Sequence, residues 1–185
     1  INGNGTVTNT GTINAGGHAI YLADGGTVTT TNGSISGGNA IQLDGDGAVT
    51  ASGGTISASG TAIRINGQGT ASITGTTITA GGDGIHLTHN GPVNLSGGRL
   101  NAAGYAVLLD NGGTVGINST AITGGSVAIT GDGLMTIANS GSVTADDYAI
   151  YSPVDIALTN HTGGRITGGV IGVYLYDGGG TITNE

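Results

Sequence analysis

The sequence contains no cysteine, phenylalanine or tryptophan, and only two of its 185 residues are proline. Without cysteine no disulfide framework can hold a loop-rich fold together. A chain exported unfolded through an oxidising compartment would also have no thiols to cross-link. Without Phe and Trp, the core must be a narrow stack of Ile, Val, Leu and Ala. Most of the stability should then come from ladder hydrogen bonds and packing between neighbouring repeats.

Positive charge is also scarce. The chain has no Lys and three Arg against eleven acidic residues, which gives a net charge of −8 with neutral His. Nucleic acids and anionic membranes need basic side chains to neutralise their phosphates, so this balance argues against both partners. Charged residues make up only 8% of the chain, so repulsion between two copies should be weak in salt. No apolar run reaches 18 residues, so we expect no membrane insertion by this segment.

What the sequence does contain is a repeat of 21 to 23 residues, visible as three aliphatic columns. The middle column is Ile13, Ile35, Ile56, Ile78, Leu100, Ile122, Val143 and Ile166. The third column is Ile20, Ile41, Ile63, Ile85, Val107, Ile129, Ile150 and Val173. The first column is Val7, Val28, Val49, Val93, Val115 and Ile182, and we expect Ile73, Ile137 and Ile156 to complete it with a shift of a residue or two.

Each repeat predicts three strands and three corners. The aliphatic residues alternate with Thr, Ser and Asn, a period of two that indicates strands, and Gly-Gly, Asn-Gly and Asp-Gly pairs suit the corners between them. Stacked repeats place each strand beside its equivalent, so every ladder is parallel and the crossovers should be right-handed. We therefore predict one all-β array over residues 1–185, a right-handed parallel β-helix of about eight coils. A two-strand amyloid-type solenoid is the alternative, made less favourable by three apolar columns and only two Gln.

The repeats resemble those of bacterial autotransporter passengers, which leave the cell by type V secretion. The likeness is carried by runs such as Gly26-Thr27-Val28-Thr29, His18-Ala19-Ile20-Tyr21-Leu22 and Gly172-Val173-Tyr174-Leu175-Tyr176, and it extends over essentially the whole chain. It implies a segment of a longer passenger domain, located at a bacterial cell surface or secreted. Such passengers are often adhesins or self-associating factors, and fewer carry a separate protease or lipase domain. No Gly-Asp-Ser-Gly motif supports the protease branch here.

The third strand of each repeat carries the bulky outward side chains, whereas the first two present mostly Thr, Ser and Asn. We predict a binding face there, with the candidate residues Tyr21, Arg64, His86, Tyr105, Tyr148, Tyr151, Tyr174 and Tyr176. Exposed Tyr rings can stack on sugars or dock a protein, because they supply contact area at low entropic cost. The alternative is ordinary cross-strand packing on an exposed sheet.

Acidic residues recur at the corner after the third strand: Asp24, Asp44, Asp46, Asp110, Asp132 and Asp177. Tight turns favour Asp before Gly, so we assign these residues a structural role, with Asp24 and Asp44 or Asp46 as the best candidate calcium ligands. His86 and His89 could share a metal only if the corner turned His89 back toward His86. We predict no bound metal and no cofactor.

Two further features bear on function. Pro92 and Pro153 should remove ladder donors at corners, and residues 160–165 should lengthen the seventh unit, so loops could leave the rod there. Asp146-Asp147 is the only adjacent acidic pair, and adjacent strand residues diverge, which argues against a polysaccharide hydrolase or lyase. We predict a non-enzymatic adhesin or self-association module whose partner is a host surface protein or glycan, or another rod. An inert stalk and a polysaccharide-active enzyme are the alternatives.

Overall fold

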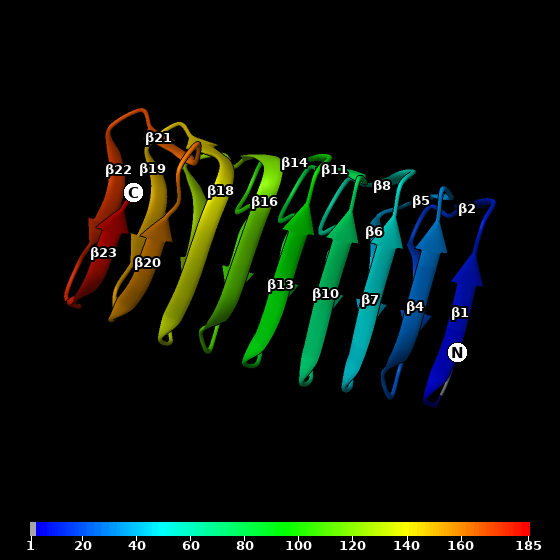
Figure 1. The fold of residues 1–185 in the computed structure, drawn as a ribbon. Coiled ribbons are helices and arrows are strands. Elements are labelled where there is room, and N and C mark those ends of the chain that lie inside the picture. Colours follow the sequence, from blue (N-terminus) through cyan, green and yellow to red (C-terminus); the bar gives the residue numbers. More distant parts are fainter. Residues whose placement is uncertain (1–2) are drawn as a thin grey trace.

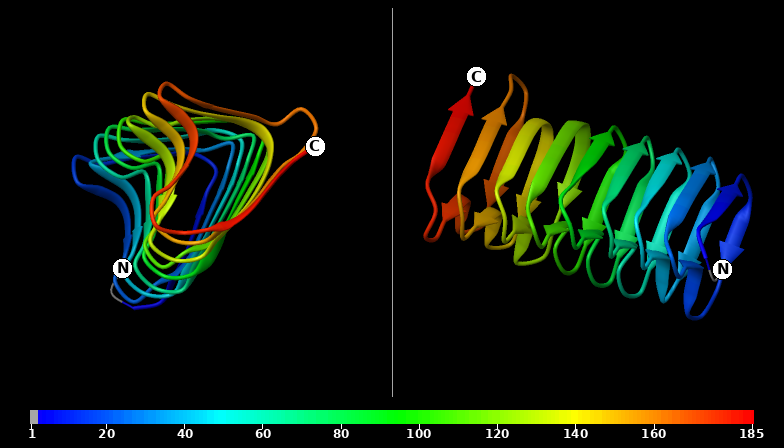
Figure 2. Two further views of the ribbon diagram at one scale, coloured as in Figure 1. Left: turned by 90° about the vertical axis from the view of Figure 1, so that its left-hand side faces the viewer. Right: turned by 90° about the horizontal axis from the view of Figure 1, so that it is seen from below.

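The computed structural model describes residues 3–185, and in them the chain winds as a three-sided parallel solenoid. Seen along its axis, successive coils superpose on a triangular outline, and the two ends of the chain lie at opposite ends of the rod (Figure 2). The predicted all-β solenoid of about eight coils is therefore confirmed. The described residues contain no helix that is long and apolar enough to span a membrane.

Three columns of strands form the sides of the rod (Figure 1). The first side contains β1 (Gly5–Asn9), β4 (Gly26–Thr31), β7 (Gly47–Ser52), β10 (Gly69–Thr74), β13 (Gly91–Ser96), β16 (Gly113–Thr123), β18 (Met135–Ala145), β20 (Ile156–Asn160) and β23 (Gly180–Asn184). The second side contains β2 (Thr12–Asn14), β5 (Ser34–Gly37), β8 (Thr55–Ala58), β11 (Thr77–Ala80), β14 (Arg99–Ala102), the later halves of β16 and β18, and β21 (Arg165–Gly168). The third side contains β3 (His18–Leu22), β6 (Asn39–Leu43), β9 (Ile63–Ile65), β12 (Ile85–Leu87), β15 (Val107–Leu109), β17 (Val127–Gly131), β19 (Tyr148–Ser152) and β22 (Ile171–Leu175).

The predicted middle and third aliphatic columns are confirmed residue by residue. Every member of each column is paired in register with its neighbour one coil away, as in Ile35 with Ile56 and Ile63 with Ile85. Most of these side chains have no exposed surface, and they stack along the axis of the rod. The spacing of about 22 residues therefore reports the length of one coil.

The first column was predicted less accurately. The register places Ala71 and Leu158 in it, while Ile73 and Ile156 belong to the two flanking inward columns. Ile137 lies in the column without a shift. The error has a simple cause: a strand of five or six residues presents three positions to the core, and an aliphatic residue can occupy any of them.

At two neighbouring inward positions, one coil places the large and the small side chain in the opposite order from most other coils. Six coils combine a large residue at the end of the third strand with a Gly at the start of the next first strand, as in Leu87 with Gly91. In the coil containing β17, Gly131 takes the place of the large residue and Met135 takes the place of the Gly. A Cβ added to Gly131 would lie 3.0 Å from the Met135 sulfur. The Met side chain thus fills the space that the small residue leaves.

Irregularities gather toward the C-terminal end, as expected. The turn between β20 and β21 is two residues longer than its counterpart one coil earlier, because Asn139 pairs with Asn160 while Ser142 pairs with Arg165. This turn projects from the outline of the rod (Figure 2). Pro92 differs from the expectation: it lies within β13 opposite Thr114, and not at a corner.

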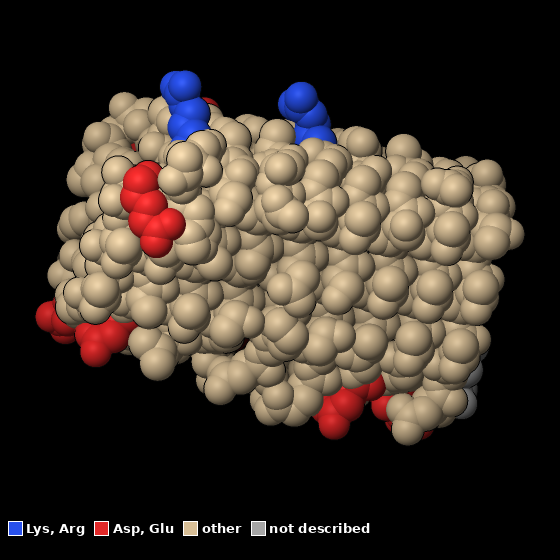
Figure 3. All heavy atoms as spheres, in the orientation of Figure 1, with Lys and Arg blue, Asp and Glu red and all other residues tan. Residues whose placement is uncertain are grey.

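The outward columns of the first side carry no charge. Its two outward columns are Thr6, Thr27, Ala48, Thr70, Pro92, Thr114, Thr136, Ala157 and Thr181, and Thr8, Thr29, Thr50, Ser72, Asn94, Gly116, Ala138, Thr159 and Thr183. Figure 3 shows acidic and basic side chains only at the margins of this side and at the C-terminal end of the rod. A second neutral surface could approach it without electrostatic repulsion.

Because stability in such an array depends on contacts between neighbouring coils, a core deletion should cost most in the middle of the rod. Ile63→Ala removes a side chain with no exposed surface, so we expect it to lower the free energy of unfolding by about 2–5 kcal/mol. The matched change Ile182→Ala affects a residue that is 51% exposed in the last strand, and it should cost less than about 1 kcal/mol. Urea unfolding of both variants measures the difference, and equal losses would contradict the one-dimensional packing.

Candidate functional site

The third side of the rod is the most varied surface. Its two outward columns contain all eight candidate residues except Tyr176, which lies just after β22. The structure divides these eight residues into two groups. A polar group with Tyr21, Arg64 and His86 occupies the first half of the rod. The five remaining Tyr lie toward its C-terminal end.

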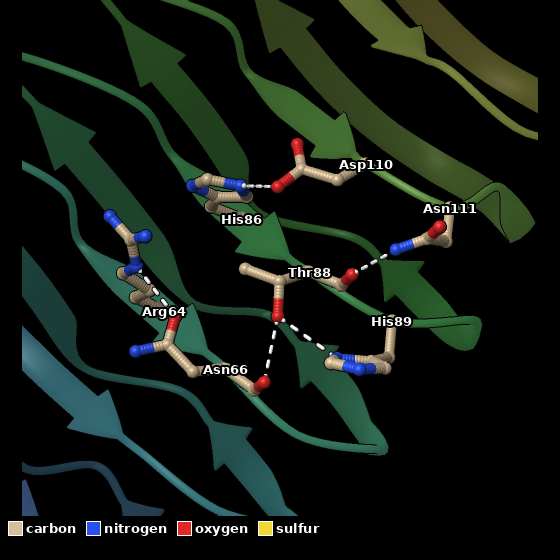
Figure 4. A network of polar contacts seen from close by, with 7 residues as sticks. All are labelled: Arg64, Asn66, His86, Thr88, His89, Asp110 and Asn111. Carbon is tan, nitrogen blue, oxygen red and sulfur yellow. Dashed lines mark hydrogen bonds and ion pairs between the residues drawn. The ribbon is translucent and has the colours of Figure 1, made fainter.

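In the polar group, side chains hydrogen-bond along and across the coils. The Tyr21 hydroxyl donates to the Asp44 carboxylate at 2.5 Å, and the amides of Gln42 and Asn66 donate to the other Asp44 oxygen at 2.7 Å each. The Arg64 Nε donates to the Asn66 side-chain oxygen at 2.7 Å (Figure 4). These contacts pair the Asp44 carboxylate with side chains of the same surface, so they rigidify this half of the third side.

The same contacts set the ionisation of two groups. The pKa of the Asp44 carboxyl is lowered, first by the hydrogen bond from Tyr21 and then by that from Gln42, with smaller effects of Asn66 and Arg64. The pKa of Tyr21 is raised, chiefly because its hydroxyl donates to Asp44 and a phenolate there would face a carboxylate.

His86 does not form the metal site that the sequence left open. Its Nε2 lies 2.9 Å from a carboxylate oxygen of Asp110 on the next coil, whereas the His89 Nδ1 lies 3.1 Å from the Thr88 hydroxyl (Figure 4). Asp83 accepts a hydrogen bond from the Tyr105 backbone amide. Within residues 3–185 no three His, Cys, Asp or Glu side chains converge as metal ligands would.

Four of the five C-terminal Tyr form an aromatic cluster. The rings of Tyr148 and Tyr174 stack with centroids 5.2 Å apart and planes 25° apart, and Tyr151 lies 5.7 Å from Tyr174 and 6.2 Å from Tyr148. We call these three residues the tyrosine trio. Tyr176 meets Tyr174 edge to face at 6.4 Å and is 68% exposed. Such arrangements stabilise the rings beyond their burial, so the trio is a fixed aromatic surface.

Tyr105 does not touch the trio but stands across a hollow from it. The hollow has a volume of about 350 Å³ and is lined by Tyr105, Leu108, Val127, Thr130, Asp132, Tyr148 and Tyr151. It exists because β17 presents Val127 and Thr130 between the larger residues of β15 and β19. The sequence reasoning missed the hollow, although a small residue between two large ones in each column was the available signal.

A scan against protein-family models matches residues 1–122 to the family described as the right handed beta helix region. That span covers about two thirds of the chain. The chain belongs to the right-handed β-helix family. The match also agrees with the handedness predicted from the parallel crossovers. Neither a search of curated proteins nor a search of solved structures finds a match.

Membership of the right-handed β-helix family gives the architecture, and function has to be argued from the surface. In this β-helix the acidic corners mostly serve the turns. Asp46 accepts a hydrogen bond from the Gln68 backbone amide at 2.7 Å, and Asp155 accepts one from Gly179 at 2.7 Å. Of the six Asp residues predicted at these corners, Asp44, Asp46 and Asp110 accept contacts from a neighbouring coil, which is consistent with the structural role predicted for them.

The Asp44 contacts give a pH prediction for this β-helix. A carboxyl whose pKa is lowered by folding stabilises the fold above its unfolded pKa of about 4, and the contribution disappears as the pH falls through the folded value. Asp44→Asn should therefore lower the melting temperature at neutral pH, and the difference from the parent chain should shrink as the pH falls below about 4 and through the lowered pKa of Asp44. Asp146→Asn, at an exposed position, controls for the loss of one charge. A gap that stays constant with pH would contradict the assignment.

Proposed function

We propose that this β-helix is an extracellular adhesive rod, a segment of a cell-surface or secreted passenger of the autotransporter type. It acts by lateral binding to a second surface, either another rod or a host surface. The observation that carries the proposal is the tyrosine trio, because stacking of coils collects aromatic rings that are far apart in sequence into one fixed patch.

Interface physics supports this use of the patch. Tyr is among the residues that contribute most to binding energy at protein surfaces, since it covers a large area and loses little rotamer freedom. The rings are already held by one another, which reduces the entropy lost on binding. Exposed aromatic clusters rimmed by polar residues are typical of interaction sites.

The low charge of the rod supports lateral contact. The first side carries no charged side chain in its two outward columns, so two rods can lie close together on that side. Thr and Ser hydroxyls on such a face can exchange water for hydrogen bonds to a partner. The net charge of −8 is spread over the margins and corners, where salt screens it.

Replacing Tyr148, Tyr151 and Tyr174 together by Ser tests the proposal. We expect at least about a tenfold weaker association in sedimentation velocity across a concentration series, and a matching loss of clumping by cells that display the chain. The control is Ser57→Ala with Thr77→Ala and Thr79→Ala, three exposed changes on the second side that leave both the trio and the first side intact. A parent chain that stays monomeric at every concentration, with clumping unchanged in the trio variant, would reject the proposal.

A further inference from the structure

The hollow between Tyr105 and the tyrosine trio has the features of a small-molecule site. Its volume of about 350 Å³ lies at the lower end of the range for ligand pockets. Aromatic rings bound it on both sides. Its lining also contains two polar residues, Thr130, which is 7% exposed, and Asp132, which is exposed. A flat ligand with apolar faces and hydroxyl edges fits such a setting.

The walls are fixed by the coil register. Tyr105 precedes β15, and Tyr148 begins β19, so the backbones of the two walls are two strand spacings apart, about 10 Å. Val127, on the coil between them, is in register with Tyr148. Tyr148 and Tyr151 are also braced by Tyr174 from the next coil. The gap is therefore preformed, and binding needs no rearrangement of the wall.

The topology disfavours a peptide in this position. An extended peptide binds most readily by adding a strand to the edge of a sheet. The three strands beneath the hollow have no free edge, because β15 pairs with β12 and β17, and β19 pairs with β17 and β22. Recognition here has to use side chains alone.

The charge of the hollow selects among small ligands. Asp132 is the one charged residue in its lining, and no Arg belongs to that lining. An anionic ligand would meet a carboxylate with no cation to compensate. A neutral ligand with hydroxyl groups can instead donate to the Asp132 carboxylate, which is an acceptor only.

From these observations we infer that the hollow binds one residue of a neutral saccharide. The pyranose ring lies against the tyrosine rings, and a sugar hydroxyl donates to Asp132. This assignment rests on the proposed function, since it names the chemical class that the third side of the rod recognises. In this assignment the small side chains of Val127 and Thr130 leave the space, one coil wide, in which the sugar ring binds.

Filling the hollow tests the inference without removing its walls. Val127→Tyr continues the aromatic column through the gap, and Tyr is compatible with the fold because it occupies this column at both flanking coils. Thr61→Tyr, in the same column three coils earlier, is the matched control. Both variants should melt like the parent chain and keep the tyrosine trio.

The measurement is binding of the labelled full chain to an array of neutral gluco-, manno- and galacto-oligosaccharides together with uronic and sialylated ones. The best neutral glycan is then titrated by intrinsic tyrosine fluorescence, which no Trp obscures in this chain. We expect saturable binding to a neutral glycan, weakened at least about tenfold by Val127→Tyr and by Asp132→Ala, and unchanged in Thr61→Tyr.

The inference would be overturned if no neutral glycan on the array bound the parent chain more strongly than it bound the Val127→Tyr variant. A preference of the parent chain for the acidic glycans would also overturn it. The experiments distinguish failure of the sugar site from failure of the proposed function. Loss of clumping in the trio variant with an empty array would reject the sugar site alone. Glycan binding by a chain that neither associates nor clumps would reject self-association and leave the sugar site standing.

Discussion

The in-register pairing of each strand with its equivalent in the next coil is the constraint on which the whole structure depends. It aligns the backbone hydrogen bonds into continuous parallel ladders, and it also places like side chains directly above one another. Inside the rod this produces unbroken stacks of Ile, Val and Leu. Outside the rod it produces columns in which residues 21 to 23 positions apart become neighbours. The charge and the aromatic content of each surface therefore depend on which residues occupy its columns.

The same rule explains how the core tolerates variation. Gly131 and Met135 exchange the sizes found at the equivalent positions of other coils. Toward the C-terminal end, one inward column changes from aliphatic residues to Asn. Asn139, which has no exposed surface, donates to Asn160 at 2.8 Å, and Asn160 donates to Asn184 at 2.7 Å. The buried Asn139 amide is stable there because Asn160 of the next coil supplies its partner.

Sequence reasoning could find what is repeated. Residues such as Ile35 and Ile63 recur at one fixed spacing, so the coil length, the strands and the outward columns of the third side could all be predicted. It failed where a choice among equivalent positions was needed: Ile73 and Ile156 were assigned to the wrong inward column. It also missed the hydrogen-bonded column of Asn139, Asn160 and Asn184, because Asn is typical of corners and was not expected inside the rod. The hollow was missed because it is created by two small side chains, Val127 and Thr130, that lie between larger side chains of the coils on either side.

The coil register that creates the third side can be tested directly by paired cysteines, since the natural chain has none. Gln42 and Arg64 are register partners on adjacent coils, so cysteines at these positions should have Cα atoms about 5 Å apart and form an intramolecular disulfide on oxidation. Cysteines at Gln42 and His86, two coils apart at about 10 Å, should remain reduced within one molecule. Ready cross-linking of the second pair, or failure of the first in a folded chain, would contradict the register and with it the binding face built upon it.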